Sequence, residues 1–178
     1  MSAIEVVAKP VLSKAESEWL IQVRERQAHN VGPPEFTLVF PGTTSPTREV
    51  TEHVKAVCAA TSRIHFCLRS AVIVPDDSHS SFLVFLVPDA GFGAIVRLHD
   101  RLHVGPLAAC LRPEVPYIPH ITIAAVKEFV LARRIKASLN SNDFAIAGHL
   151  DELEVHERDA GAPRCVAKVP LVHHGIFH

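Results

Sequence analysis

The spacing of apolar residues divides the first part of the chain into a helix and a strand. Ser13 and Glu16 have the form of a capping box, and apolar residues then recur at helical spacing, which predicts a helix over residues 14–28. Large apolar side chains occupy every second position of residues 35–40, and prolines bound this segment on both sides. That alternation predicts a strand.

The rest of the chain continues to alternate between helical and strand patterns. Ser45-Pro46 predicts the start of a second helix, with Ser45 as its N-cap and proline at its first position. The later expected elements are a hairpin of strands 64–74 and 81–87, a helix within 91–111, a strand at 119–126, a helix at 129–139, and closing strands at 144–156 and 165–177. A strand, a helix and further strands thus occur in each half of the chain, which predicts an α+β fold.

Length and linker composition indicate one folded unit. The chain has 178 residues, and a chain of this length can bury a substantial core. No linker rich in glycine, serine or proline separates the two halves. We therefore expect a single domain over residues 1–178.

Charge and cysteine usage narrow the possible partners and the location. The formal net charge is −1 and there is no long lysine or arginine run, so we expect no grip on duplex nucleic acid, although a small anionic ligand or a nucleic-acid end fits. No segment reaches the roughly 18 apolar residues that a membrane span needs. The four cysteines are scattered and form neither a disulfide framework nor a zinc motif: Cys58, Cys67, Cys110 and Cys165. Buried thiols in a cytoplasmic protein are the expected outcome.

Two pentapeptides repeat one pattern of residue types. Pro34-Glu35-Phe36-Thr37-Leu38 and Pro119-His120-Ile121-Thr122-Ile123 each read proline, polar, apolar, threonine, apolar. Because strand side chains alternate between faces, the two polar residues of each copy point to one side and the apolar residues face the core. Approximate two-fold symmetry would bring both polar pairs to one cleft.

Such a cleft suits a phosphoryl group. Threonine hydroxyls donate to non-bridging oxygens, while an acid and a base act on opposite sides of the phosphorus. A threonine or a histidine in one strand more often has a structural role. The matched pair of pentapeptides favours a site.

These motifs resemble those of the 2H phosphoesterases, a bilobal α+β family with two H-x-[ST]-x strands. Residues 119–123 match the second motif, and residues 34–41 are similar to the first motif of the 2′-5′ RNA ligase-like branch, with Glu35 in place of the histidine. The helices that contain Trp19-Leu20 with Arg24 and Leu98-His99-Asp100-Arg101-Leu102 also resemble that branch, so the likeness covers residues 14–128.

The resemblance implies two pseudo-symmetric lobes, each with an antiparallel sheet and outer helices. It further implies hydrolysis of a 2′,3′-cyclic phosphate, or making and breaking of a 2′-5′ linkage, on a nucleotide or RNA end. If the matching positions keep the roles that they have in the family, His120 is a catalytic acid or base, and Thr37 and Thr122 bind the phosphate. The resemblance also implies that neither a metal nor another cofactor is required. The alternative is a catalytically degenerate module that binds a phosphorylated or nucleotide ligand.

Three roles remain open for Glu35. A carboxylate about 5 Å from a phosphate, at an effective dielectric near 20, is repelled by roughly 3 kcal/mol, which would raise its pKa into the range of a general acid. Glu35 would then be catalytic as the acid, with His120 as the base. If it stays ionised, it opposes substrate binding. Alternatively, it pairs with a nearby arginine and is structural.

The other histidines are interpreted as structural. His65 begins a segment, His65-Phe66-Cys67-Leu68, that imitates the motif with a thiol in the hydroxyl position, but the family has no motif there. His99 and His103 are one helical turn apart and without an evident third metal ligand, so a solvated helix face is the preferred interpretation. The histidines at 173, 174 and 178 indicate a strand end.

Overall fold

Two antiparallel sheets form the centre of the protein. The computed structural model describes residues 3–27, 31–43, 46–76, 80–159 and 161–172. The four-stranded sheet has the order β3 (Phe36–Thr43), β1 (Ala3–Ala8), β8 (Glu152–Arg158), β9 (Arg164–Pro170). The five-stranded sheet has the order β2 (Val11–Leu12), β7 (Ile146–Leu150), β4 (Ile64–Pro75), β5 (Phe82–Ala90), β6 (Ile121–Val126). The predicted two-sheet α+β architecture is confirmed.

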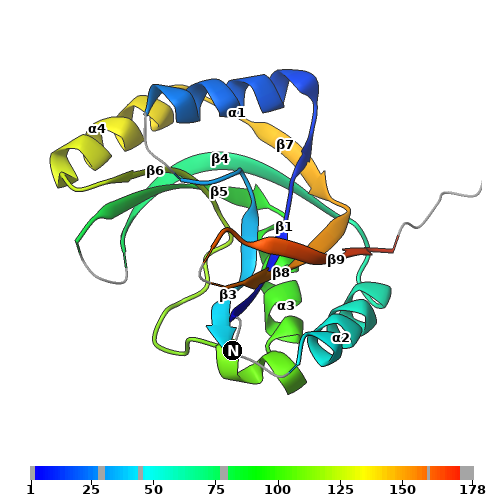
Figure 1. Ribbon diagram of the computed structural model, residues 1–178. Coiled ribbons are helices and arrows are strands. Elements are labelled where there is room, and N and C mark those ends of the chain that lie inside the picture. Colours follow the sequence, from blue (N-terminus) through cyan, green and yellow to red (C-terminus); the bar gives the residue numbers. More distant parts are fainter. Residues whose placement is uncertain (1–2, 28–30, 44–45, 77–79, 160, 173–178) are drawn as a thin grey trace, which may run out of the picture.

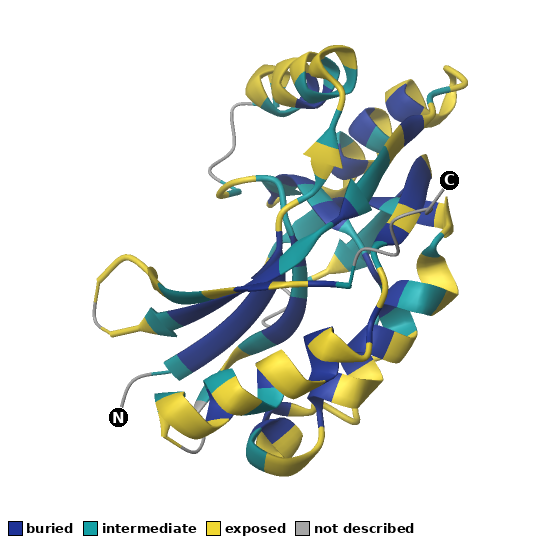
Figure 2. Cartoon of the chain, turned by 90° about the vertical axis from the view of Figure 1, so that its right-hand side faces the viewer, coloured by how far each residue is buried: buried dark blue, intermediate teal, exposed yellow. Residues whose placement is uncertain are grey.

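Helices cover the outer side of each sheet. The helices α1 (Lys14–Arg26) and α4 (Phe129–Asn140) lie together along the five-stranded sheet, where α4 contacts β4, β5 and β6 (Figure 1). The helices α2 (Thr47–Ala59) and α3 (Phe92–Leu102) lie at the other end of the molecule, where α2 contacts β8 and β9 and α3 contacts β3. Each helix is striped, with buried residues on one side and exposed residues on the other (Figure 2). Such stripes are typical of helices packed on a sheet.

The apolar residues of the two pentapeptides lie in the core. Phe36, Leu38, Ile121 and Ile123 are each 0 % exposed, as the alternation predicted. Full burial of one such side chain stabilises the fold by roughly 1.5–3 kcal/mol. The burial pins the register of β3 and β6, because a slip of one residue would turn these side chains outward.

The first two helices follow their sequence signals closely. Ser13 and Glu16 form the predicted capping box at the start of α1. The second helix begins one residue later than expected, because Pro46 is the N-cap and Thr47 the first helical residue. The expected cap, Ser45, lies outside the described residues.

The predicted helix within 91–111 is confirmed, but it occupies only the first half of that segment. The helix α3 ends at Leu102, and a 3-10 helix, η1 (Gly105–Cys110), follows. Gly105 has a φ of +57°, in the left-handed region that a side chain disfavours, and Pro106 carries no N–H for a continuing helix. These two residues therefore separate the helical segments.

The prediction of one closing strand over 144–156 is wrong. The segment breaks at Asp151, so that β7 lies in the five-stranded sheet and β8 in the four-stranded sheet. The strand β1, which the sequence analysis did not predict, pairs with β3 on one side and β8 on the other. The sheets therefore do not correspond to the two halves of the chain. The last predicted strand is β9, and residues 173–177 lie outside the described part.

Two further expectations concern cysteines and membranes. Cys58, Cys67 and Cys110 are buried as predicted, whereas Cys165 on β9 is exposed, because its side chain lies near the end of the sheet's last strand. Among the described residues, no helix has the length and apolarity that crossing a membrane requires.

Candidate active site

A cavity of about 620 Å³ lies where the two motif strands approach each other. The strand β3 is an edge of the four-stranded sheet and β6 is an edge of the five-stranded sheet. Thr37 of β3, His120 immediately before β6, and Thr122 of β6 all line this cavity. The structure thus brings together three of the four polar residues of the two pentapeptides.

The imidazole of His120 is held in one orientation. Its Nδ1 lies 2.6 Å from the carbonyl oxygen of Ile118, and its ring stacks on Phe85 at a centroid distance of 3.5 Å. A carbonyl oxygen only accepts, so Nδ1 carries the proton and Nε2 has a free lone pair in the neutral ring. Burial lowers the pKa of His120, which favours this neutral form.

The two threonines are placed by contacts to their backbone carbonyls. The Tyr117 hydroxyl donates to the carbonyl oxygen of Thr37 over 3.2 Å, and Arg24 Nε donates to that of Thr122 over 3.2 Å. Within the described residues, neither threonine hydroxyl has a hydrogen-bond partner. Both hydroxyls are therefore available to a ligand in the cavity.

Arg24 connects the two motif regions. Besides the bond to Thr122, its Nη2 donates to the carbonyl oxygen of Val31 over 3.3 Å and to that of Gly32. These residues come shortly before β3, whereas Thr122 lies on β6, so a single guanidinium from α1 links the approach to one motif with the other motif. From the sequence, Arg24 was expected only as part of the family resemblance.

Glu35 lies beside the cavity rather than among the residues that line it. Its Oε2 is buried and has no hydrogen-bond partner in the described structure. Burial raises the pKa of Glu35, and the neighbouring carboxylate of Glu5 raises it further. The hydrogen bonds of Arg24 go to carbonyl oxygens, but its guanidinium also interacts electrostatically with the carboxylate of Glu35. The raised pKa fits the protonated acid, and the attraction to Arg24 fits the structural pairing, so both roles of Glu35 stay predictions.

Two further histidines line the same cavity, although the sequence predicted them to be exposed. His99 and His103 were expected on a solvated helix face, but they are 6 % and 8 % exposed. Both line the cavity, and the ring of His99 stacks on Tyr117 at 3.9 Å. They are buried because α3 packs against β3 and β5, and their place next to the buried Leu98 and Leu102 was the available signal.

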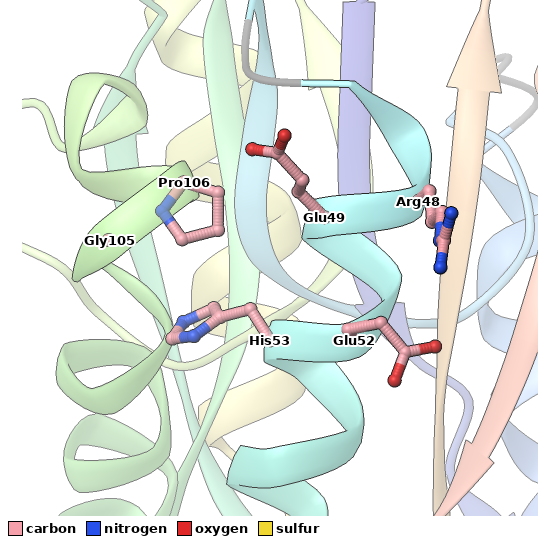
Figure 3. A pocket seen from close by; sticks show the side chains of 6 residues that line it. All are labelled: Arg48, Glu49, Glu52, His53, Gly105 and Pro106. Carbon is pink, nitrogen blue, oxygen red and sulfur yellow. The ribbon is translucent and has the colours of Figure 1, made fainter.

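Two other surface features do not form part of this site. His65 is exposed on β4, as its structural interpretation allows. A hollow of about 600 Å³ between α2 and η1 contains the carboxylates of Glu49 and Glu52, which disfavour an anion (Figure 3). In Figure 3, Glu52 points away from Pro106, so the polar side chains around the hollow do not point toward one common position.

Possible metal ligands gather elsewhere. In the described part of the chain, one group of three histidine, cysteine or acidic side chains has its donor atoms within 4.8 Å of one another. It consists of Glu154, His156 and Cys165, on β8 and β9, and none of these residues lines the cavity. The cavity itself is lined by hydroxyls and imidazoles together with Arg112 and the carboxylates of Asp76 and Asp100.

Comparison with solved structures identifies the same fold in other proteins. TT0787 of Thermus thermophilus aligns with a TM-score of 0.67 at 15 % identity, over 97 % of this chain and 100 % of that one. E. coli LigT, crystallised with 3′-AMP, aligns with a TM-score of 0.62 at 13 % identity, over 96 % and 98 %. Kluyveromyces marxianus Usb1 aligns with a TM-score of 0.60 at 8 % identity, over 95 % and 98 %.

Sequence comparison gives the family. No curated protein sequence matches the chain. Residues 11–162, however, match the 2′-5′ RNA ligase superfamily, and this stretch contains both motif strands and the cavity between them. The resemblance inferred from the two pentapeptides is confirmed. The chain belongs to the 2′-5′ RNA ligase superfamily.

Proposed function

We propose that this protein is a metal-independent phosphodiesterase that acts on a 2′,3′-cyclic phosphate or a 2′-5′ linkage of a nucleotide or RNA end. One observation carries the proposal: Thr37, His120 and Thr122, contributed by two different sheets, line a single cavity. Membership of the superfamily supports a phosphoesterase-type function. The ligand in the LigT structure, 3′-AMP, has the chemistry of a product of such a reaction.

The local geometry supports a division of labour between His120 and Glu35. The Nε2 lone pair of His120 accepts a proton from water, and the water oxygen attacks the phosphorus. The bond from phosphorus to the leaving ribose oxygen breaks, and Glu35 gives that oxygen its proton. Both pKa directions suit these roles, since burial lowers the pKa of the base and raises that of the acid. Hydroxyls of Thr37 and Thr122 donate to the non-bridging oxygens throughout.

A binding module is the second candidate, and the position of Glu35 is the observation that favours it. Because Glu35 does not line the cavity, the acid must reach the leaving oxygen by a change of side-chain conformation or through one water. Without that approach, the two threonines and His120 would bind a phosphate without turnover.

A substrate screen separates the two candidates. Purified full-length protein is incubated with 2′,3′-cyclic nucleotides and with 2′-5′-linked oligonucleotides, each with and without a chelator. We expect hydrolysis that survives the chelator and is lost in His120→Ala. His65→Ala is the matched control, because His65 is exposed and imitates the motif without lining the cavity. Ligand binding without product in the parent protein would identify the binding module, and activity that depends on an added divalent ion would contradict the metal-free mechanism.

A further inference from the structure

A three-residue group on the four-stranded sheet has the composition of a zinc site. Glu154 and His156 lie on β8, and Cys165 lies on β9 directly opposite His156 in the strand pairing. Directly paired residues of antiparallel strands project to the same face. One oxygen, one imidazole nitrogen and one sulfur therefore lie within 4.8 Å of one another. Carboxylate, imidazole and thiolate are the ligands that zinc uses in proteins.

The surroundings of His156 match the support that metal-binding histidines have. Its Nδ1 lies 3.6 Å from the carboxylate of Glu5, which is paired opposite it on β1. Its Nε2 lies 2.8 Å from Glu154 Oε2, so this nitrogen already points toward the proposed ligand group. At 3.6 Å the Glu5 carboxylate is too far for a hydrogen bond, and a small movement would let it accept the Nδ1 proton while Nε2 faces a metal. Arg158 in turn holds Glu5 through a contact of 3.1 Å.

Glu154 is the least accessible ligand of the group. Its side chain is 2 % exposed, and its Oε1 lacks a hydrogen bond of good geometry. Ammonium groups nevertheless lie close to both oxygens: Lys168 Nζ is 2.7 Å from Oε1, and Lys9 Nζ is 2.9 Å from Oε2. A metal at this position therefore competes with Lys168, whose side chain is 56 % exposed and can move into solvent.

We propose that Glu154, His156 and Cys165 form a zinc-binding site, with solvent as the fourth ligand. Zinc bonds of about 2.0–2.3 Å place tetrahedral ligand atoms roughly 3.3–3.8 Å apart. All three donor atoms lie within 4.8 Å of one another, and the imidazole and carboxylate are already 2.8 Å apart, so small side-chain movements suffice. The Cys165 thiol loses its proton to solvent as its sulfur binds the ion. The site joins β8 to β9 and lies apart from the cavity, so the proposal is independent of the phosphodiesterase reaction.

Equilibrium zinc binding tests the site directly. Full-length protein is titrated with Zn²⁺ in competition with a chromophoric chelator at neutral pH. We expect one equivalent to bind, and Cys165→Ser to weaken binding at least about tenfold, which corresponds to about 1.4 kcal/mol. Because Cys165 is exposed, this variant retains the core. Glu152→Gln is the matched control, since Glu152 lies on the same strand, also approaches Lys168, and is not one of the three ligands.

Two further measurements sharpen the result. Cobalt in place of zinc should give a thiolate-to-metal absorption band in the parent protein that is absent in Cys165→Ser. Lys168→Met should bind zinc more tightly than the parent, because it removes the competing ammonium. The proposal is overturned if the parent takes up no zinc equivalent, if Cys165→Ser binds zinc as tightly as the parent, or if Lys168→Met binds it more weakly.

Discussion

The two motif strands share one residue pattern but differ in their surroundings. Immediately before β6, His120 packs on the apolar ring of Phe85, its Nδ1 is held by a carbonyl oxygen, and it lines the cavity. Immediately before β3, the equivalent residue, Glu35, lies near Glu5, His156 and other charged groups around the four-stranded sheet. The same position in the motif therefore does not give the same surroundings, because the neighbouring strands decide the partners and the proton affinity of each side chain.

The surroundings also bear on the protonation of the glutamate. Burial and the nearby carboxylate of Glu5 raise the pKa of Glu35, which favours its neutral form. The pairing partners of β3 through β1 to β8 place Thr37, Val7 and Glu154 in one row of the sheet.

The largest expected effect is a loss of activity when His120, the motif residue before β6, is replaced. Replacing His120 by alanine removes the proposed base and should lower kcat/KM by a factor of order 10²–10⁴. Steady-state hydrolysis of a 2′,3′-cyclic nucleotide measures this. A variant within a few-fold of the parent would show that His120 is not the catalyst.

The next effect concerns the stability that the ionised carboxylate of Glu154 contributes to the four-stranded sheet. Burial alone would raise the pKa of Glu154, but Lys168, Lys9 and His156 together lower it to about 2. The pKa in the unfolded chain is 4.5, so the stabilisation is complete above that pH and disappears as the pH falls toward 2. Glu154→Gln should therefore lower the free energy of unfolding by about 3 kcal/mol at pH 7. The loss should shrink at pH 3.

Urea denaturation in a chelator at the two pH values measures this difference. Glu152→Gln serves as the control, because its side chain is 43 % exposed and its pairing with Lys168 is screened by solvent. Equal destabilisation by both variants would contradict the special role of Glu154.

A smaller effect is expected at the link between the two motifs. Arg24→Lys keeps the charge but loses the guanidinium, whose separate N–H groups donate to the carbonyl oxygens of Thr122 and Val31. We expect about a tenfold loss of kcat/KM, worth about 1.4 kcal/mol, with partial rescue of Arg24→Ala by added guanidinium. Arg26→Lys, an exposed change at the end of the same helix, should have no effect. Failure of rescue together with parental activity in Arg24→Lys would assign Arg24 a role in folding alone.

The smallest effect concerns Glu35 and is clearest as a pH profile. The proposed roles need His120 deprotonated and Glu35 protonated, and their pKa values are shifted down from 6.5 and up from 4.5. The rate should therefore peak on the acidic side of neutrality. Glu35→His should move the alkaline limb to higher pH and raise cyclic-phosphate hydrolysis at neutral pH several-fold, because imidazole has an unperturbed pKa near 6.5.

Two outcomes at Glu35 would change the comparison. If Glu35 serves a different phosphoester, the same substitution should lower the native activity while cyclic-phosphate hydrolysis rises. A folded Glu35→His protein that binds and hydrolyses cyclic phosphates no better than the parent would mean that the β3 side has diverged beyond this one position.

Local signals in the sequence determined most of the elements and the candidate site. Capping residues and apolar periodicity located α1, β3 and β6 because these signals act over a few residues. The alternation within each pentapeptide also determined which side chains face the core, and all four apolar residues are buried. The family resemblance followed from the same two segments.

Only the tertiary structure decided the pairing of distant segments and the surroundings of each titratable group. Three features depend on strands far apart in sequence. They are the passage of the chain from one sheet to the other at Asp151, the position of β1 between β3 and β8, and the proximity of Glu154 and His156 to Cys165. Burial of His99 and His103 likewise depends on what packs against α3. Proton affinity follows burial and neighbouring charge, which the order of residues along one strand does not contain.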